Sequence, residues 1–275
     1  MHKDYIEGYF IDLDGTMIDK TDETGFLTEE NKNFLRELQK IKPVIISTGR
    51  RPTGAVAEIM AMINAPYAVC STGGVVIDSR GNFVREILIE NDTKLQLFQY
   101  FMSKKLNFIV NGIDNIYHFG DKFTWDKRDW VKRFNKISYD GFDLTQNIRQ
   151  TLVFGPGLEE IAQLEKYINT NFPNLSTHVV SHGYSIEVTD KKATKGTSNA
   201  FVAQLLNIDI KKCAHIGDSR NDVLALPDTG YLVAMGNADD EVKKVANFIG
   251  ENFANAGLSR TIQNFEKFIN EKESK

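Results

Sequence analysis

The stretch Tyr9–Thr16 (YFIDLDGT) decides how the rest of the sequence is interpreted. Its first part, Tyr9–Ile11, is a short apolar run that predicts a buried strand, and Asp12–Thr16 follows as an acidic turn. Ligands of open α/β sheets bind beyond the carboxyl ends of the strands. With the period of a strand, Asp12 and Asp14 point the same way, which brings two carboxylates together. These carboxylates repel each other unless a cation intervenes. The stretch therefore favours a Mg²⁺ site, although a lone acidic turn is often only a solvated loop.

Outward from this stretch, residues 1–80 and 189–275 alternate short apolar runs with helical patterns. Residues 43–46 predict a second strand, and Thr28 is placed to cap a helix. The apolar face of that helix would be Phe34, Leu35, Leu38 and Ile41. The alternation predicts an α/β core with a parallel sheet. Within residues 81–188, aromatic residues and strand-like segments become more frequent, which predicts an inserted α+β domain.

Composition restricts the function. The net charge is −4, which argues against broad electrostatic binding to nucleic acid. No run approaches the roughly 18 apolar residues of a membrane span, and charged residues stand where a leader peptide needs apolar ones. Cys70 and Cys213 are far apart and form no C-x-x-C pair, which favours reduced thiols. We expect a cytoplasmic protein, monomeric or a small homo-oligomer, that binds neither nucleic acid nor membranes.

A second acidic cluster, Gly217–Asp222 (GDSRND), also follows an apolar run and precedes a helical pattern. A parallel sheet would place it at the same edge as Asp12, where carboxylates from two strand ends can hold one metal ion. The alternative is a helix N-cap formed by Ser219 or Asn221. A cap explains one polar residue well, but it does not explain the whole string.

Two further strings could bind phosphate. Ser47–Arg50 (STGR) ends the second strand, where a hydroxyl group, main-chain N–H groups and a bidentate Arg50 can hold phosphoryl oxygens. Lys195, followed by Gly196, could neutralise negative charge between Asp12 and a bound phosphate. Taken singly, the first string is typical of an ordinary turn and the second of a solvated lysine.

Together, the four strings resemble the haloacid dehalogenase-like (HAD) superfamily, and within it the Cof-type phosphatases. The strings are DLDGT, STGR, KG and GDSRND, in that order, from residue 10 to about residue 222. The resemblance implies a Rossmann-like core with a large α+β cap, the insertion at residues 81–188, that closes over the site and selects the substrate. It implies an Mg²⁺-dependent phosphatase that acts on small organic phosphate monoesters through an aspartyl-phosphate.

The resemblance also implies a role for each site residue. Asp12 would be the nucleophile and Asp14 the general acid and base. The metal ligands would be Asp12, the main-chain carbonyl of Asp14, and Asp218, with Asp222 supporting the metal site through its water shell. The implied phosphate-binding residues are Thr48, Gly49, Arg50, Lys195 and Asn221.

Several alternatives stay open at this point. A phosphomutase shares the aspartyl-phosphate, and a phospho-accepting signalling module also uses a strand-end aspartate; Asp14 and the large insertion argue against the latter. A catalytically idle binding protein is a third reading. Sugar phosphates and phosphorylated cofactors such as pyridoxal phosphate or flavin mononucleotide are all possible substrates. Candidate wall residues of the cap, each of which could equally be an ordinary aromatic, are Tyr117, His118, Trp125, Trp130, His182 and Tyr184. Ser71–Gly74 stands where relatives more often have an Asn-Gly pair.

Overall fold

The structure is a computed structural model that describes residues 5–20, 26–120, 129–155 and 157–273. The chain folds as two compact units, one of Met1–Glu86 with Ala193–Lys275 and the other of Ile87–Lys192. Sequence analysis places the insertion at residues 81–188, and the division in the structure falls after Glu86 and after Lys192. Phe83–Glu86 lies in the first unit because it pairs as a strand with the sheet of that unit.

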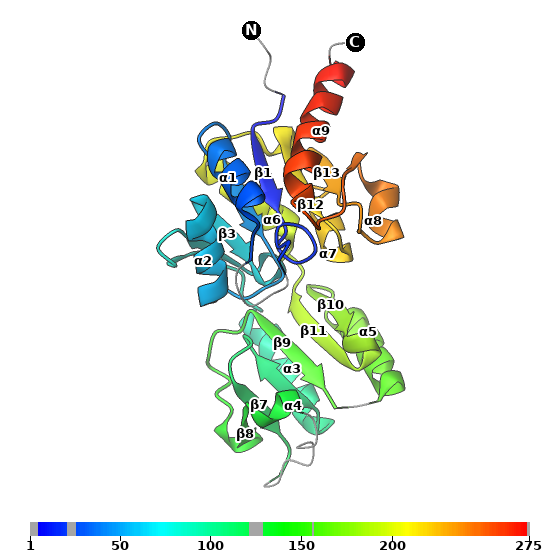
Figure 1. The fold of residues 1–275 in the computed structure, drawn as a ribbon. Helices are drawn as coiled ribbons and strands as arrows, with labels where there is room; N and C mark the ends of the chain where they lie inside the picture. Colours follow the sequence, from blue (N-terminus) through cyan, green and yellow to red (C-terminus); the bar gives the residue numbers. More distant parts are fainter. Residues whose placement is uncertain (1–4, 21–25, 121–128, 156, 274–275) are drawn as a thin grey trace. The chain divides into compact units, whose positions relative to one another are not determined.

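The first unit is built on an eight-stranded sheet (Figure 1). Across the sheet the strands are β14 (Phe248–Ile249), β13 (Tyr231–Ala234), β12 (Cys213–Gly217), β1 (Gly8–Ile11), β2 (Val44–Ser47), β3 (Tyr67–Cys70), β4 (Val75–Asp78) and β5 (Phe83–Glu86). The strands from β14 to β3 are parallel, and β4 and β5 continue the sheet antiparallel. All four residues of β1 are buried, as expected for a central strand covered on both faces. This architecture confirms the predicted α/β fold class.

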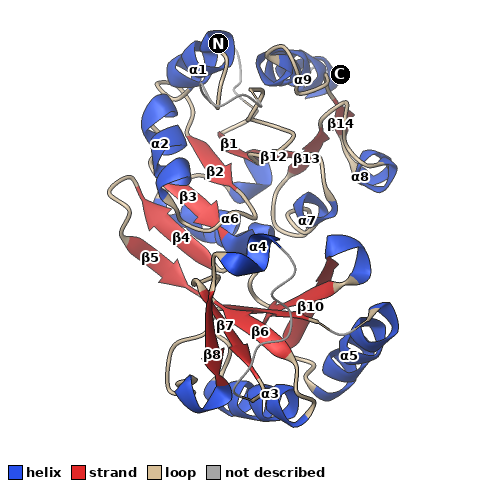
Figure 2. Cartoon of the chain, turned by 60° about the horizontal axis from the view of Figure 1, so that its bottom comes forward, coloured by secondary structure: helices blue, strands red, loops and turns tan. Residues whose placement is uncertain are grey.

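Helices cover both faces of this sheet (Figure 2). One face carries α1 (Glu29–Leu38), α2 (Gly54–Ile63) and α9 (Gly257–Glu273), and the other carries α6 (Lys195–Leu205), α7 (Arg220–Val223) and α8 (Asp240–Val245). Successive residues of β1 alternate between the two faces. Ile11 packs in the same cluster as Leu35 and Ile262, whereas Phe10 packs with Val202 of α6. The apolar run of β1 therefore joins both layers of helices to the sheet.

The first helix shows how far local sequence determines structure. Thr28 is the N-cap of α1, and its hydroxyl oxygen accepts a hydrogen bond from the main-chain N–H of Asn31 at 3.3 Å. Leu35 and Leu38 are buried, as predicted. The assignment of Ile41 to the same apolar face was wrong, because the helix ends at Leu38 and Ile41 is 74% exposed.

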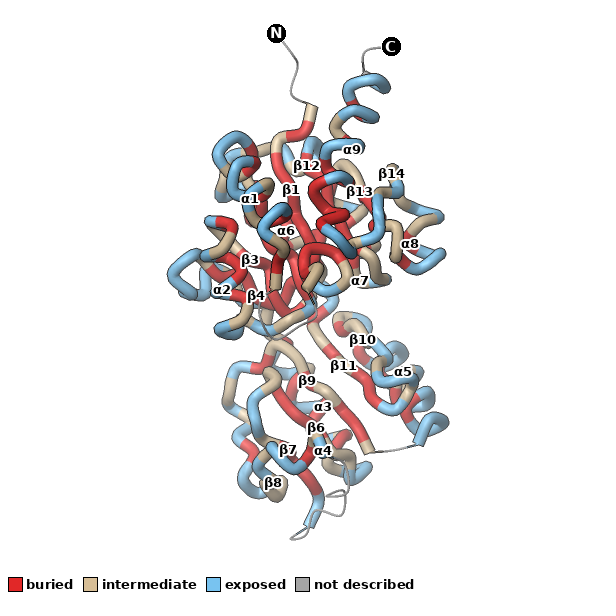
Figure 3. The backbone as a smooth tube through the Cα atoms, viewed as in Figure 1, coloured by how far each residue is buried: buried red, intermediate tan, exposed pale blue. Residues whose placement is uncertain are grey.

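The second unit has its own six-stranded sheet. Its strands are, in order across the sheet, β10 (Leu175–Val180), β11 (Ser185–Asp190), β9 (Gln150–Phe154), β6 (Asn107–Val110), β7 (Asn115–His118) and β8 (Asn135–Ser138). All neighbours pair antiparallel except β7 and β8. Helices α3 (Asn91–Ser103) and α5 (Leu158–Asn171) share one apolar core with this sheet, and α4 (Asp129–Lys132) packs in a second cluster. Much of β9 and β11 is buried (Figure 3), so the unit is an α+β structure with its own core.

The candidate wall residues of this unit fall into two groups. Tyr117 and His118 are buried, and Trp130 packs edge-on against Phe154. His182, in the 3₁₀ turn η3 (Ser181–Gly183), and Tyr184, which follows this turn, are exposed; Trp125 lies outside the described residues. Two other 3₁₀ turns are η2 (Tyr139–Gly141) and η4 (Ile210–Lys212).

Among the described residues of the chain, every helix is too short or too polar to cross a lipid bilayer.

The sheet of the first unit brings three of the four sequence strings to one edge. Strand β1 lies between β12 and β2, with Ile11 in register with both Ile216 and Ile46. Asp12, Thr48 and Asp218 are the first residues after these three strands. Because parallel strands end at the same edge, the three residues share one side of the sheet.

A tight turn, η1 (Ser71–Gly73), packs beside this edge. The main-chain N–H of Ser71 donates to the carbonyl of Arg50, and that of Thr72 donates to the carbonyl of Thr48. On its other side, the carbonyl of Gly73 accepts a hydrogen bond from the hydroxyl of Ser198 in α6 at 2.7 Å. The turn thus connects the loop after β2 to the start of α6.

Gly73 allows the closest approach in this region, which gives a first prediction. A Cβ atom on Gly73 would lie 2.0 Å from the carbonyl oxygen of Thr194, and its φ of +100° is unfavourable for other residues. Gly81 has a similar φ of +81°, but a Cβ there meets no described atom within 4 Å. Gly81→Ala should therefore lower the free energy of unfolding by only about 1–2 kcal/mol. Gly73→Ala should cost at least about 1 kcal/mol more, because the overlap adds to the backbone strain.

Urea denaturation of the two variants and the wild type measures both free energies. Equal losses in the two variants would show that the turn does not pack against the start of α6 as described.

Candidate active site

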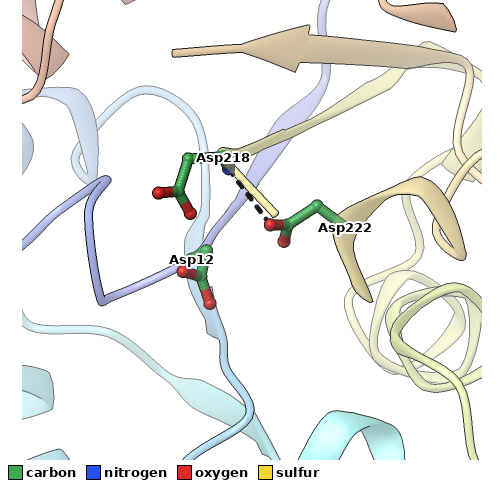
Figure 4. A group of neighbouring side chains, drawn as sticks. All are labelled: Asp12, Asp218 and Asp222. Carbon is green, nitrogen blue, oxygen red and sulfur yellow. Dashed lines mark hydrogen bonds between the residues drawn. The ribbon is translucent and has the colours of Figure 1, made fainter. Parts of the chain in front are cut away.

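Three carboxylates form a cluster at the carboxyl edge of the first unit's sheet (Figure 4). Asp12 follows β1, Asp218 follows β12, and Asp222 lies in α7. One carboxylate oxygen from each lies within 4.8 Å of the other two. An all-oxygen, acidic donor set of this kind suits a hard divalent cation such as Mg²⁺, so the residues present fit the predicted metal.

Lys195 lies between two of these carboxylates. Its side chain is fully buried, and its Nζ donates to Oδ1 of Asp12 at 2.7 Å and to Oδ1 of Asp222 at 2.6 Å. Lys195 is the first residue of α6, whose N-cap is Thr194 in a capping box with Thr197. Burial alone would lower the pKa of Lys195, but the two carboxylates outweigh it and raise the pKa, which keeps the ammonium charged.

Asp222 is the most heavily hydrogen-bonded member of the cluster. Its Oδ1 accepts from Lys195 and from Nε2 of His215, the latter at 2.7 Å. Its Oδ2 accepts from the main-chain N–H groups of Asp218 and Ser219, at 3.1 and 3.0 Å. Burial acts to raise the pKa of Asp222, but Lys195 and the bond from His215 lower it well below the usual range. Asp222 is therefore an ionised carboxylate that holds the ammonium of Lys195 in place.

Asp12 has a different electrostatic environment. Burial raises its pKa to about 7; the negative charge of Asp222 adds to this effect and Lys195 opposes it. In the described part of the chain, its second oxygen, Oδ2, accepts no hydrogen bond. Burial and the charge of Asp222 also raise the pKa of Asp218, to about 6. The cluster holds excess negative charge that a divalent cation would offset.

Asp218 is tied to the turn after β1. The side-chain amide of Asn237 donates both to Oδ2 of Asp218 at 3.2 Å and to the main-chain carbonyl of Gly15 at 2.9 Å. The same residue accepts a hydrogen bond from the main-chain N–H of Phe253 through its Oδ1. Asn237 thus fixes the two acidic turns relative to each other.

Asp14 and Arg50 form a pair on the outer side of the site. Nε and Nη2 of Arg50 donate to the two oxygens of Asp14 at 2.8 and 2.6 Å. The side chain of Asp14 is 59% exposed and that of Arg50 is 34% exposed, in contrast to the buried cluster. The hydrogen bond from Arg50 to Asp14 is the main cause of a raised Arg50 pKa. The structure therefore joins Arg50 to the predicted general acid.

The remaining predicted phosphate-binding residues lie on the loop after β2 and in the first turn of α7. Thr48 is buried, and its hydroxyl accepts a hydrogen bond from the main-chain N–H of Arg50 at 3.1 Å. A Cβ on Gly49 would lie 3.5 Å from Nδ2 of Asn221, so these two strings are adjacent. Oδ1 of Asn221 accepts from the hydroxyl of Ser219 at 3.0 Å, which leaves its amide N–H groups on the side of Gly49.

Sequence analysis did not single out His215, Asn199 or Asn237. His215 is the middle residue of the buried strand β12, and Asn199 is a buried residue of α6. A polar residue inside an apolar run is a usable signal, since buried polar groups need partners. The identity of the partners depends on the tertiary fold, and the sequence alone does not supply it.

Comparisons with known proteins find a matching family model and several similar proteins. A family model described as "haloacid dehalogenase-like hydrolase" matches residues 9–262. The 5-amino-6-(5-phospho-D-ribitylamino)uracil phosphatase YcsE of Bacillus subtilis is 26% identical over 93% of this chain and 94% of its own. A phosphoglycolate phosphatase of Methanobrevibacter smithii is 27% identical over 94% of this chain and 98% of its own.

A solved structure of a phosphatase of the haloalkanoate (HAD) enzyme superfamily, from Bacteroides thetaiotaomicron, shares the fold. Its TM-score is 0.78 at 17% sequence identity, over 94% of this chain and 95% of that one.

The raised pKa values of Asp12 and Asp218 predict how stability depends on pH without divalent cations. The folded protein holds these two protons more tightly than the unfolded chain, whose aspartates titrate near pH 4. Their stabilising contribution is complete below about pH 4 and is lost as the pH rises through about 6 and 7. Asp222 titrates in the opposite sense, but below this window. The free energy of unfolding of Asp12→Asn, minus that of the wild type, should therefore rise by on the order of 2 kcal/mol between pH 5 and pH 8.

Chemical denaturation in the presence of a chelator, at pH 5 and at pH 8, measures this difference. A constant difference between the two proteins across that range would show that Asp12 carries no raised pKa.

Proposed function

Because the chain belongs to the haloacid dehalogenase-like hydrolase family, we propose that it is an Mg²⁺-dependent phosphatase whose nucleophile is Asp12. Its substrates are small organic phosphate monoesters, such as sugar phosphates or phosphorylated cofactors. The observation that carries the proposal is the buried Lys195 bridging Asp12 and Asp222, beside Asp218. This arrangement gives a carboxylate nucleophile, a fixed positive charge and an acidic metal site in one place.

Asp12 attacks through the oxygen that Lys195 does not hold. Oδ1 is engaged by the ammonium, so Oδ2 forms the new bond to phosphorus while the bond from phosphorus to the leaving oxygen breaks. Asp14 donates a proton to that oxygen. A water molecule then attacks the aspartyl-phosphate, Asp14 takes up its proton, and the bond between phosphorus and Asp12 breaks to release inorganic phosphate. Lys195 reduces the repulsion between the two anions in the first step.

Mg²⁺, when bound, supplies Lewis-acid stabilisation of the charge on the phosphoryl oxygens. Asp12 and Asp218 would hold it directly, together with the main-chain carbonyl of Asp14. Asp222 does not bind the ion directly in this proposal, because its two oxygens already accept hydrogen bonds from Lys195, His215 and two main-chain N–H groups. Its part is to hold Lys195 and the turn of Asp218 in place, and to contact the water shell of the cation.

Phosphate binding is assigned to Thr48, Gly49, Arg50, Lys195 and Asn221. The loop after β2, with Thr48 and Gly49, lies beside Asn221 of α7, and this adjacency supports the assignment because the two segments can surround one anion. Arg50 must release Asp14 to reach a phosphoryl oxygen. Both side chains of this pair are partly exposed, so water can solvate the two charges while the exchange takes place.

The second unit, Ile87–Lys192, is proposed to select the substrate. Its separate apolar core supports an independent role for this unit, in which His182 and Tyr184 are exposed. The cytoplasm is the proposed location, consistent with two free, buried cysteines. A phosphate-release screen over a panel of metabolites, with analysis of the organic products, identifies the substrate. Migration of the phosphate within the product would indicate a mutase instead.

Asp12→Asn should abolish phosphate release, because an amide cannot form the aspartyl-phosphate. We expect the rate with p-nitrophenyl phosphate and Mg²⁺ to fall by at least about 10³-fold. Asp78→Asn, in the exposed turn between β4 and β5, is a matched control that should keep the wild-type rate. Adding a chelator should remove the wild-type activity as well. Intact activity in a folded Asp12→Asn protein would rule out the proposed nucleophile.

Asp14→Asn should leave the nucleophile in place but remove the general acid and base. The expected loss in kcat is about 10²–10⁴-fold. p-Nitrophenolate is a good leaving group, so the second step should suffer more than the first. Rapid-mixing experiments should therefore show a burst of p-nitrophenolate followed by slow turnover. A slow first step without a burst would mean that Asp14 does not activate the attacking water.

A further inference from the structure

A row of three buried polar side chains runs behind the carboxylate cluster. Ser47 is the last residue of β2, Asn199 lies in α6, and His215 lies in β12, so each comes from a different element of the first unit. All three are fully buried. The mechanism above uses none of them, and burying polar side chains costs free energy unless they are hydrogen-bonded.

The hydrogen bonds in this row all point one way. The hydroxyl of Ser47 donates to Oδ1 of Asn199 at 2.9 Å. Nδ2 of Asn199 lies 3.2 Å from Nδ1 of His215, and Nε2 of His215 lies 2.7 Å from Oδ1 of Asp222. An ionised carboxylate can only accept, so Nε2 carries the proton and donates to Asp222.

The other ring nitrogen completes the assignment. Nδ1 of His215 faces the amide nitrogen of Asn199, which can only donate, so Nδ1 carries no proton. One tautomer of a neutral ring satisfies both contacts. Asn199 holds that tautomer, and Ser47 fixes the amide of Asn199 by donating to its oxygen.

We propose that His215, oriented by Asn199 and Ser47, is a positioning residue that fixes Asp222 and, through it, the ammonium of Lys195 against Asp12. The inference rests on the proposed phosphoryl transfer at Asp12. Oδ1 of Asp222 is the atom that both His215 and Lys195 contact, so the donor from His215 sets where this oxygen lies. Because Nζ of Lys195 is hydrogen-bonded to that oxygen, its position relative to Asp12 is fixed as well.

A neutral donor suits this position better than a charged one. A second cation beside Asp222 would compete with Lys195 for Oδ1 of that carboxylate. Among the described residues, Lys195 is the cation that forms ion pairs with both Asp12 and Asp222. The row thus holds the carboxylate of Asp222 in place without changing the net charge of the site.

A matched pair of variants at His215 tests the proposal. His215→Gln can keep an N–H donor near the place of Nε2, whereas His215→Leu has a similar size and no donor. We expect His215→Leu to lower kcat for p-nitrophenyl phosphate by about 10–100-fold, as is typical for residues that orient catalytic groups, with a much smaller change in KM. His215→Gln should stay within a few-fold of the wild type.

Stability is the control for a purely structural effect. Thr151→Val removes a buried hydrogen bond to the carbonyl of Ile109 in the second unit, far from this row in sequence and in the other compact unit. It should lower the unfolding temperature without the loss in kcat. If the folded His215→Leu protein keeps the wild-type kcat, or if His215→Gln loses as much as His215→Leu, the positioning role is wrong.

A spectroscopic measurement tests the row independently of activity. Nitrogen-15 NMR of the histidine rings, with His215→Gln used for assignment, should show His215 protonated at Nε2 and not at Nδ1. Asn199→Asp replaces the donor to Nδ1 with an acceptor, so it should shift the proton to Nδ1 or charge the ring, and it should lower kcat.

The two proposals fail in different ways. A wild-type protein that releases no phosphate from any ester overturns the proposed function, while the ring spectrum still reports on the hydrogen-bond row. A His215 ring protonated at Nδ1 in the wild type overturns the inference, whatever the activity.

Discussion

The buried ammonium of Lys195 is the interaction on which the site depends. Removing a charge from water costs several kcal/mol, and only close, well-hydrogen-bonded counterions offset this cost. Lys195 meets the condition through Asp12 and Asp222, at 2.7 and 2.6 Å. The loss of one partner would leave a buried charge uncompensated, at a cost of about 3–5 kcal/mol. Three segments far apart in the sequence must therefore assemble together: the end of β1, the start of α6 and the short helix α7.

This requirement explains how the first unit accommodates an insertion. The chain leaves the unit after β5 and returns at Ala193, two residues before the lysine. Within the first unit, the start of α6 is fixed by its own capping box and by contact with Gly73 of η1. The hydroxyl of Ser198 adds a buried hydrogen bond to the same turn. Lys195 is thus held by the core itself, so the inserted segment can vary without moving the ammonium.

Sequence patterns predicted the core of the site better than its surroundings. Asp12 and Asp218 each follow an apolar run, and the rule that parallel strands end at one edge was enough to predict their proximity. The family and the α/β fold were also predicted correctly. The orientation of His215 depends on Asn199, which lies 16 residues earlier on another element, so local pattern could not reveal it. The prediction that Ile41 lies on the apolar face of α1 failed for a related reason, since periodicity does not show where a helix ends.

The exposure of the site residues matches the proposed division of labour. Asp12 and Lys195 are buried and hydrogen-bonded to each other, as suits a nucleophile and a cation that must keep one geometry through both proposed steps. In the proposed mechanism Asp14 gives up a proton and then takes one, and its side chain is exposed beside Arg50. A proton carrier needs contact with water and with a leaving group that arrives from outside, and a firmly buried carboxylate would have neither. The contrast between a rigid buried cluster and an exposed, exchangeable pair therefore follows from the two-step chemistry itself.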